Sequence, residues 1–499
     1  MTRRYLWRIK LQLAKVRNGK NEYVFLTKSS IRNLLSDNYP LLSILIGIGL
    51  VSVSIGPFQN GDTQWEYEAA SGVIRWGMPY VGSIGNMINQ PPLGFYIEAL
   101  FFKVFGLSFD VGVALVTLFG LGCIVLVYKI GKVLYGKSKG LLAAALFALT
   151  PWEIVLSRTF LIDVQCLFFS LFCLFVGISA IRKDSFKLSM ISGTFFAAAL
   201  LTKLFAVFTL IPLFLFYVYY RPKNLRRTFS LFVAFVLPVL LFAFLWYQVI
   251  SGKGLLSVFH HADFVKYNSS DVVPSYFFVG NFLFNYGLGW FFMSATVFSL
   301  LVCFLRRKIF SKFLVFDLIC LTTIVSVVSV NTFLGASLNL EAPYLNAIKY
   351  DYQSLPFFSL LAATLPSKCL LLFNSAKSKR KLNKLLLFSI ALVGLFLLAA
   401  SIFVNIVFAN FFSRWNYLLF RVEMDKNVGY SLFNPTPTDK YSLLMNIQYL
   451  GFAFVLSGLV WASRHKLAEA LKPIRRWIET KSNKQLIKIQ EDPFRTKNL

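Results

Sequence analysis

Charged and metal-ligating side chains are scarce in this sequence of 499 residues. Only 15% of its residues are charged, and it has three histidines and six cysteines. The cysteines stand within or at the ends of apolar runs, so neither a zinc site nor a disulfide framework is expected. The chain also lacks a G-x-S-x-G elbow, a P-loop and an H-E-x-x-H motif, and none of these enzyme signatures is available to explain it.

Apolar residues dominate instead. The chain is 57% hydrophobic and 17% aromatic, with a mean hydropathy of +0.64, which is well outside the range of soluble globular proteins. Several apolar runs are about 20 residues long, enough for a helix to cross a bilayer. These features predict an all-α, polytopic integral membrane protein.

The apolar runs predict about twelve transmembrane helices and four longer polar loops. The loops cover residues 59–108, 251–280, 335–353 and 409–441. Short surface helices are expected in the first loop, because aromatic and charged residues alternate there. The predicted spans are 39–58, 109–129, 140–155, 159–181, 188–201, 204–220, 229–250, 281–305, 313–334, 354–373, 385–408 and 442–462.

The distribution of basic residues tests this topology. Every second connection, starting after the second span, is rich in Lys and Arg and carries Asp184 as its one acid. This alternation is the positive-inside pattern, and it predicts cytoplasmic termini with the large loops on the far side. The expected parts are a basic cytoplasmic segment (1–38) without a cleavable signal, a membrane domain (39–463) and a basic cytoplasmic tail (464–499). Topology and adhesion to anionic lipids therefore account for much of the net charge of +29, and no nucleic-acid partner is expected.

The most polar and acidic connection is the stretch Gly61–Tyr96 in the first loop. Asp62 follows the first span directly, and an Asn-Gln-Pro-Pro turn that includes Gln90 comes later in the stretch. Polar loops carried by an apolar scaffold are where chemistry concentrates. Asp62 is a candidate general base or metal ligand, because nearby apolar spans tend to raise a carboxyl pKa. The alternative is an ordinary loop acid.

Three charged residues stand at the edges of later spans. Asp163 lies five residues after Arg158 at the far-side end of a predicted span, so it is expected to face an internal cavity or to pair with Arg158. Lys203 interrupts the apolar stretch Leu188–Tyr220. The charge alternation requires a break there, and a cation at a break between short spans suits phosphate binding. Snorkelling of Lys203 to the interface is the alternative.

Two further far-side segments carry candidate ligands. The loop 251–280 holds the adjacent His260 and His261, followed by Asp263 and Lys266. Their spacing does not indicate a strong metal site, and solvated loop residues are the simpler interpretation.

The segment Ala342–Pro356 places Lys349 and Tyr352 just before a late span. It is either an interfacial belt of Tyr and Lys or a second phosphate clamp.

Taken in order, these motifs resemble a known family. An acid after the first span is followed by G-x-P and P-P-L-x-x-Y. Then come P-W with S-R-x-x-x-x-D, L-T-K between two short spans, and Y-x-x-L-P before a late span. The set is similar to the GT-C superfamily of membrane glycosyltransferases over roughly residues 40–360. Within it, the branch of protein O-mannosyltransferases and the lipid A aminoarabinose transferase is the nearest match.

The resemblance implies a helical bundle with a far-side cavity and a sugar donor on a polyprenyl or dolichyl monophosphate. The acceptor would be a hydroxyl of a glycan, lipid or protein, attacked in a single inverting displacement at the outer face of a prokaryotic plasma membrane. No cofactor is required, and a divalent metal is compatible with the reaction but is not indicated by the sequence. The implied catalytic residues are Asp62 and Asp163, and the implied substrate-binding residues are Arg158, Lys203, Lys266 and Tyr352. Lys349, Gln90 and His261 complete the predicted substrate-binding set.

Two departures leave the acceptor open. The O-mannosyltransferases have a glutamate where this chain has Thr63, and the aminoarabinose branch has Glu-Lys where this chain has Asn89-Gln90. A transporter or flippase is the alternative function, since twelve spans with both termini inside is a common transporter plan. A non-catalytic membrane scaffold is a third.

Overall fold

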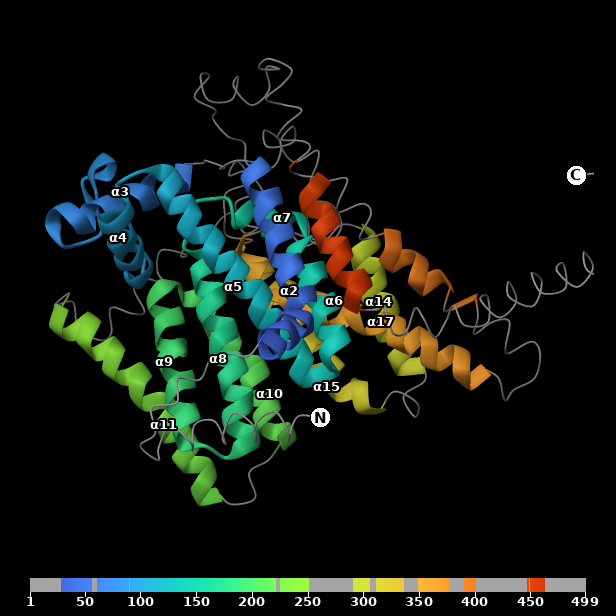
Figure 1. Ribbon diagram of the computed structural model, residues 1–499. Coiled ribbons are helices and arrows are strands. Elements are labelled where there is room, and N and C mark those ends of the chain that lie inside the picture. The colour runs from blue at the N-terminus through green and yellow to red at the C-terminus, as the bar shows by residue number, and fades with distance from the viewer. Residues whose placement is uncertain are drawn as a thin grey trace, which may run out of the picture.

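The computed structural model describes residues 28–55, 61–88, 90–220, 225–250, 290–305, 311–335, 349–376, 389–390, 392–400, 447 and 449–462. These residues form helices joined by short connections, with one small antiparallel hairpin between β1 (Tyr80–Val81) and β2 (Asn86–Met87). The predicted all-α class is confirmed (Figure 1). The helices are α2 (Lys28–Ile55), α3 (Gly61–Trp76), α4 (Leu93–Phe105), α5 (Phe109–Tyr135), α6 (Lys137–Ala148), α7 (Pro151–Leu156), α8 (Asp163–Lys183), α9 (Phe186–Thr202), α10 (Leu210–Tyr220), α11 (Leu225–Phe244), α14 (Trp290–Leu305), α15 (Ser311–Gly335) and α17 (Leu355–Ala376), with the shorter turns η1 (Gly82–Ile84), η2 (Leu204–Thr209), η3 (Leu245–Ile250) and η6 (Lys349–Ser354).

Length and composition make this an integral, multi-pass membrane protein. Among the described residues, five helical stretches are long and apolar enough to cross a bilayer: Phe109–Tyr135, Asp163–Lys183, Arg226–Phe244, Phe313–Asn331 and Asp351–Leu372. Shorter apolar helices include Phe186–Thr202, Leu204–Tyr220 and Tyr449–Ala462. Each predicted span contains helical residues, and the number of crossings, twelve, stays a prediction.

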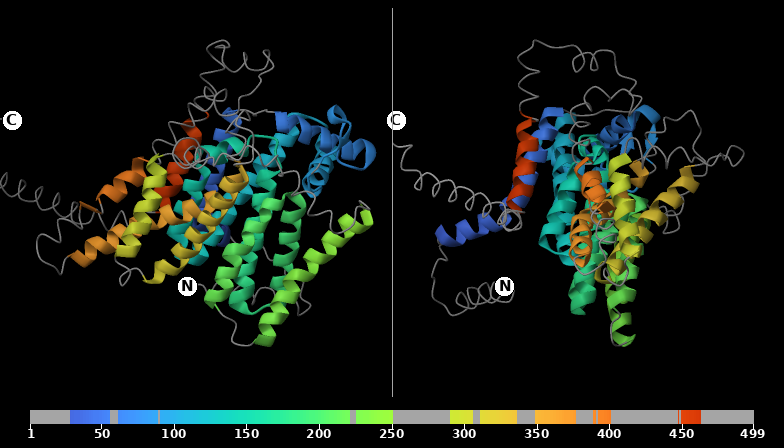
Figure 2. Two further views of the ribbon diagram at one scale, coloured as in Figure 1. Left: turned by 180° about the vertical axis from the view of Figure 1, so that it is seen from behind. Right: turned by 90° about the vertical axis from the view of Figure 1, so that its right-hand side faces the viewer.

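The structure differs from two of the predicted spans, and a proline explains one of these differences. The predicted span 140–155 is broken, because α6 ends at Ala148 and Pro151 opens the separate helix α7. A proline lacks the amide proton that would continue the helix before it, but it suits a first helical turn. The first helix begins at Lys28 rather than residue 39 and contains Pro40. Figure 2 shows the first turns of α2 running sideways before the helix enters the bundle.

The predicted surface helices of the first loop are confirmed as α3 and α4. They lie together at one end of the bundle, at the upper left in Figure 1, while the connection from α8 to α9 lies at the opposite end. The hairpin packs closely on α3 through Gly72, where a Cβ atom would lie 2.3 Å from the Tyr80 carbonyl oxygen. The acidic first loop and the basic connection between α8 and α9 therefore occupy opposite ends of the bundle.

The break predicted at Lys203 is confirmed. The helix α9 ends at Thr202, and Lys203 has an extended backbone (φ −159°, ψ 140°) before η2 begins at Leu204. At the other end of α9, Asp184 adopts a left-handed conformation (φ 53°), and the Ser185 hydroxyl caps the helix by accepting from the Leu188 amide. Because α8 and α9 form an antiparallel hairpin, the first residue of α8 and the residue after α9 lie at the same end.

The first span packs against the helix Tyr449–Ala462. A Cβ atom on Gly47 would lie 2.4 Å from the Gly451 carbonyl oxygen, and one on Gly451 would lie 2.5 Å from the Gly47 carbonyl oxygen. Ser43 forms a hydrogen bond of 2.9 Å with Ser457 across the same contact. Small residues that allow such backbone approach are typical of packed membrane helices.

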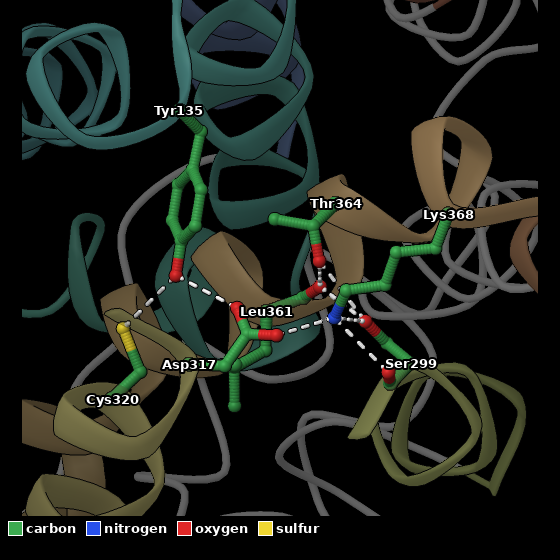
Figure 3. Close-up of polar contacts among 7 residues, drawn as sticks. All are labelled: Tyr135, Ser299, Asp317, Cys320, Leu361, Thr364 and Lys368. Atoms are coloured by element: carbon green, nitrogen blue, oxygen red, sulfur yellow. Dashed lines mark hydrogen bonds and ion pairs between the residues drawn. The ribbon is translucent and has the colours of Figure 1, made fainter. Parts of the chain in front are cut away.

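A buried ion pair lies inside the bundle between α15 and α17 (Figure 3). Lys368 and Asp317 are 0% and 1% exposed, and the Lys368 ammonium contacts an Asp317 oxygen at 2.5 Å. Lys368 lies within the predicted span 354–373. The lysine can be buried inside the bundle because Asp317, which is distant in sequence, supplies its counter-charge.

Candidate active site

The candidate site is centred on an ion pair where α8 begins. The Lys203 Nζ donates to both carboxylate oxygens of Asp163, each at 2.8 Å. The two side chains are 10% and 5% exposed. The antiparallel hairpin of α8 and α9 brings them together, because Asp163 opens α8 and Lys203 follows α9. Two predicted site residues are thus joined in one contact.

The sequence offered Arg158 as a possible partner of Asp163, but the two side chains do not pair in the structure. The Arg158 guanidinium donates instead to the Thr117 hydroxyl at 3.1 Å, and Thr117 donates to the Ser157 carbonyl oxygen at 2.8 Å. Burial lowers the pKa of Arg158, and the Asp110 carboxylate opposes that shift. Arg158 is therefore tied to α5, and Lys203 is the cation that neutralises Asp163.

The helix of Asp62 also contacts the start of α8. Glu66 lies one turn after Asp62 on α3, and its Oε2 accepts from the Ile162 amide at 2.9 Å. Ile162 immediately precedes Asp163. Residues four apart share one side of a helix, so the half-buried Asp62 is carried on the side of α3 that faces this end of α8.

Gln165 of α8 and Glu98 of α4 form a second contact beside the pair. The Gln165 Nε2 donates to the Glu98 Oε1 at 2.7 Å, and both side chains are 0% exposed. Burial raises the pKa of Glu98 well above its usual value, the charge of Glu66 raises it further, and the Gln165 bond opposes both. On the outer side of α3, hydrogen bonds from Ser83 and Gln64 outweigh partial burial and lower the pKa of Glu68.

Tyr352 is buried in the same region. Its hydroxyl donates to Glu153 Oε2 in a short hydrogen bond, and both residues are at most 1% exposed. The next residue, Gln353, donates from its Nε2 to the Cys166 Sγ of α8 at 3.5 Å. The predicted Lys349 opens η6, the turn that carries Tyr352. The segment before α17 therefore belongs to the site.

A small hollow of about 10 Å³ lies further along α8 from the ion pair. The Cys166 Sγ links the two, since it lies 3.6 Å from the Lys203 carbonyl oxygen and accepts from the Gln353 Nε2 at 3.5 Å. Gln353 lines the hollow. The other lining residues come from α8, η2, α15 and α17 and are mostly apolar: Leu167, Ser170, Leu171, Leu174, Phe208, Thr209, Thr323, Val327 and Phe357.

Three predicted residues remain: Gln90, His261 and Lys266. Gln90 is half-buried, and within the described part of the chain its Oε1 has no hydrogen-bond partner. His261 and Lys266 lie outside the described residues. No group of three His, Cys, Asp or Glu side chains that could hold a metal occurs in the ranges that the structure describes.

Sequence reasoning missed four polar residues of this end. Glu66, Glu98, Glu153 and Gln165 are all at most 2% exposed. A usable signal existed for Glu98, the one acid in an otherwise apolar helix, and for Glu66, which has helical spacing to Asp62. Together the site offers carboxylates that can accept a proton and a cation that can bind an anion.

Comparisons with known proteins match this part of the chain. A model of the family described as dolichyl-phosphate-mannose-protein mannosyltransferase matches residues 89–247, which include α4, α8 and α9. A protein of Bacillus subtilis (strain 168) named "Putative mannosyltransferase YkcB" is 27% identical over 132 residues. That match spans 26% of this chain and 18% of the relative's length.

Solved structures share the fold. ArnT from Cupriavidus metallidurans bound to undecaprenyl phosphate superposes with a TM-score of 0.50 and 14% identity, over 87% of this chain and 79% of ArnT. Its apo form gives a TM-score of 0.49 and 15% identity over the same shares of the two chains.

Proposed function

We propose that this chain, whose resemblance to the GT-C membrane glycosyltransferases is confirmed by its fold and central segment, transfers a sugar from a polyprenyl monophosphate to an acceptor hydroxyl. One observation carries the proposal. A buried carboxylate–ammonium pair, Asp163–Lys203, lies next to the helix of a second acid, Asp62. Transfer from a lipid phosphate needs a base for the acceptor proton and a cation for the leaving phosphate.

Asp62 is the proposed base, and Asp163 positions the acceptor or shares that role. The acceptor oxygen attacks the anomeric carbon, the bond from that carbon to the phosphate oxygen breaks, and a carboxylate takes the hydroxyl proton. Lys203 stabilises the departing phosphate, because an ammonium in a partly dry site interacts strongly with developing negative charge. A phosphate that reaches Lys203 would share its ammonium with Asp163. That sharing would leave a carboxylate oxygen available to the acceptor.

Further residues extend the proposed binding site. The donor phosphate and sugar would be held by Arg158, Tyr352, Gln90, Lys349, His261 and Lys266. ArnT binds undecaprenyl phosphate, and this supports the same class of lipid carrier here. A monophosphate can be neutralised by Lys and Arg alone, so the step as proposed needs no metal. We assign the reaction to residues 39–463 and to the extracytoplasmic face of a prokaryotic plasma membrane, between a basic cytoplasmic segment (1–38) and a cytoplasmic tail (464–499).

The test uses Asp62→Asn in membranes supplied with radiolabelled polyprenyl-phosphate sugar. Removal of a general base lowers turnover by roughly 10²–10⁴-fold, so transfer should fall by that order. Glu68→Gln is the matched control, because Glu68 lies on the same helix but contacts Gln64 and Ser83 at the surface. The assignment is wrong if folded Asp62→Asn protein transfers sugar at the wild-type rate.

The ion pair Asp317–Lys368 favours one alternative. Buried ionisable groups within the membrane domain are typical of transporters, and this pair lies inside the bundle. Uptake of a lipid-linked or polar solute into proteoliposomes, without sugar transfer, would support a transporter or flippase instead.

A further inference from the structure

Glu98 is a buried acid that the proposed reaction does not use. It lies on α4 among Phe95, Ala99 and Phe102, and no part of it is exposed. Its Oε1 accepts from Gln165 at 2.7 Å. Within the described residues its Oε2 is buried without a hydrogen-bond partner. A carboxylate with one neutral partner is costly to bury in its charged form.

Glu66 contacts the same turn of α8 from another helix. Its Oε2 accepts from the Ile162 amide at 2.9 Å, and the residue is 2% exposed. Ile162 is the residue before Asp163, and Gln165 is two residues after Asp163. The two loop helices α3 and α4 therefore each hold the first turn of α8, one on either side of Asp163.

The two acids act on each other electrostatically. Glu66 is the charged group that bears on Glu98, while α8 presents the neutral amide of Gln165. Two other helices, α5 and α9, also pack on α4. Among the described residues, neither helix contributes a charged group that acts on Glu98. Two neighbouring buried carboxyls do not both ionise readily, so one of them keeps its proton. Glu98 is the more buried, and its Oε2 accepts no hydrogen bond from the described part of the chain.

We propose that Glu66 and Glu98 are positioning residues that fix the first turn of α8, and that Glu98 does so in its protonated form. This rests on the proposed function, since the residue they position is Asp163. Protonated Glu98 accepts from Gln165 without repelling the charge of Glu66. Once Glu98 ionises, that repulsion separates α4 from α3 and α8. The contact between Asp163 and Lys203 then loses its support.

The contribution of Glu98 to stability should change with pH in one direction. Burial and Glu66 raise the pKa of Glu98 above its value in the unfolded chain. The contribution of Glu98 is therefore complete below the unfolded pKa and is lost as the pH rises through the folded pKa. Stability and transfer should both fall on the alkaline side.

The experiment compares Glu98→Gln, Glu98→Ala and wild-type full-length protein in nanodiscs. Glutamine mimics the protonated acid, so Glu98→Gln should keep transfer within about threefold near neutral pH, since its hydrogen bond to Gln165 is retained. Glu98→Ala removes the hydrogen bond to Gln165. Because displacement of a catalytic group by about 1 Å can lower the rate on the order of 10²-fold, sugar transfer by this variant should fall by up to that order. Glu68→Gln on the outer side of α3 is the control and should match wild type.

The distinguishing readout is the alkaline limb of the pH profile. Wild type should lose transfer and thermal stability there, and Glu98→Gln should lose less of both. An unchanged limb in Glu98→Gln, or a glutamine variant as impaired as the alanine variant, would overturn the proposal. If wild-type protein transfers no sugar from any polyprenyl-phosphate donor, the proposed function fails. The difference in thermal stability against pH still tests the role of Glu98 in that case.

Discussion

Replacing Asp317 with asparagine should destabilise the protein far more than replacing an exposed acid. The Lys368 ammonium sits between α14, α15 and α17 and donates to the Ser299 carbonyl oxygen at 3.0 Å and the Ser299 hydroxyl at 2.8 Å. Its third partner is the Asp317 carboxylate. The substituted amide could still accept a hydrogen bond, but the positive charge of Lys368 would lose the counter-ion that Asp317 supplies.

The burial of the pair sets the size of the effect. Both side chains are at most 1% exposed, so solvent does not screen the interaction. Breaking a buried pair by removing one partner costs about 3–5 kcal/mol, which is the loss expected for Asp317→Asn. The other carboxylate oxygen accepts from Tyr135 at 3.0 Å. Tyr135→Phe should therefore cost about 1.5–3 kcal/mol, the range for hydrogen bonds to charged groups.

The assay is a double-mutant cycle of Asp317→Leu and Lys368→Met. Unfolding free energies would be measured in mixed micelles by denaturant titration of the purified chain. Replacement of both charges by apolar side chains is often neutral or stabilising, so the double variant should be more stable than either single variant. The coupling energy should be at least about 3 kcal/mol.

The exposed pair Asp184–Arg227 is the matched control. Its side chains are 31% and 67% exposed, and exposed pairs contribute about 0–1 kcal/mol. Asparagine tolerates the left-handed backbone of Asp184, so Asp184→Asn tests the charge alone. A loss of less than about 1 kcal/mol for Asp317→Asn, or a double variant whose loss equals the sum of the single losses, would refute the reasoning.

Two further predictions concern helix packing and the candidate site. Gly451→Val should lower the unfolding free energy by about 1–3 kcal/mol or more, as overpacking does, because its Cβ would lie 2.5 Å from the Gly47 carbonyl oxygen. Gly49→Ala, whose Cβ would meet nothing within 4 Å, should leave thermal stability unchanged. Lys203→Met should reduce both sugar transfer and retention of polyprenyl phosphate, and also destabilise the protein because Asp163 stays buried. Adding Asp163→Asn should recover stability but not transfer, and recovery of transfer would contradict the role of Lys203 at the phosphate.

The sequence located the charged residues of the site better than it paired them. Asp163 and Lys203 stood out because charges at span ends are costly unless compensated. Their pairing depends on the antiparallel packing of α8 and α9. Hydropathy predicts the two helices but not which side chains of one contact which side chains of the other. Arg158 was closer in sequence to Asp163, but its short connection directs it toward Thr117.

Buried polar residues inside apolar helices were the main omission. Lys368 lies near the end of the predicted span 354–373, where a lysine is expected to reach the membrane surface. Its burial is explained by Asp317 on another helix. Glu98 stands alone as an acid among mostly apolar residues, and its partner Gln165 comes from a different helix, so no local pattern connects the two. Such contacts arise from tertiary packing, so a one-dimensional pattern can flag an isolated charge but cannot name its partner.

The packing of Gly47 against Gly451 has a consequence for biosynthesis. The helix α2 leaves the ribosome hundreds of residues before Tyr449–Ala462, yet the two are in direct backbone contact and share the hydrogen bond between Ser43 and Ser457. Until the later helix is inserted, the side of α2 that carries Ser43 and Gly47 lacks its contact with Gly451 and Ser457. The loop that carries Asp62 follows α2 directly, so its final placement depends on a helix made late in translation. A nascent chain stalled before that helix would present the first loop on an incompletely assembled scaffold, which membrane quality control could recognise.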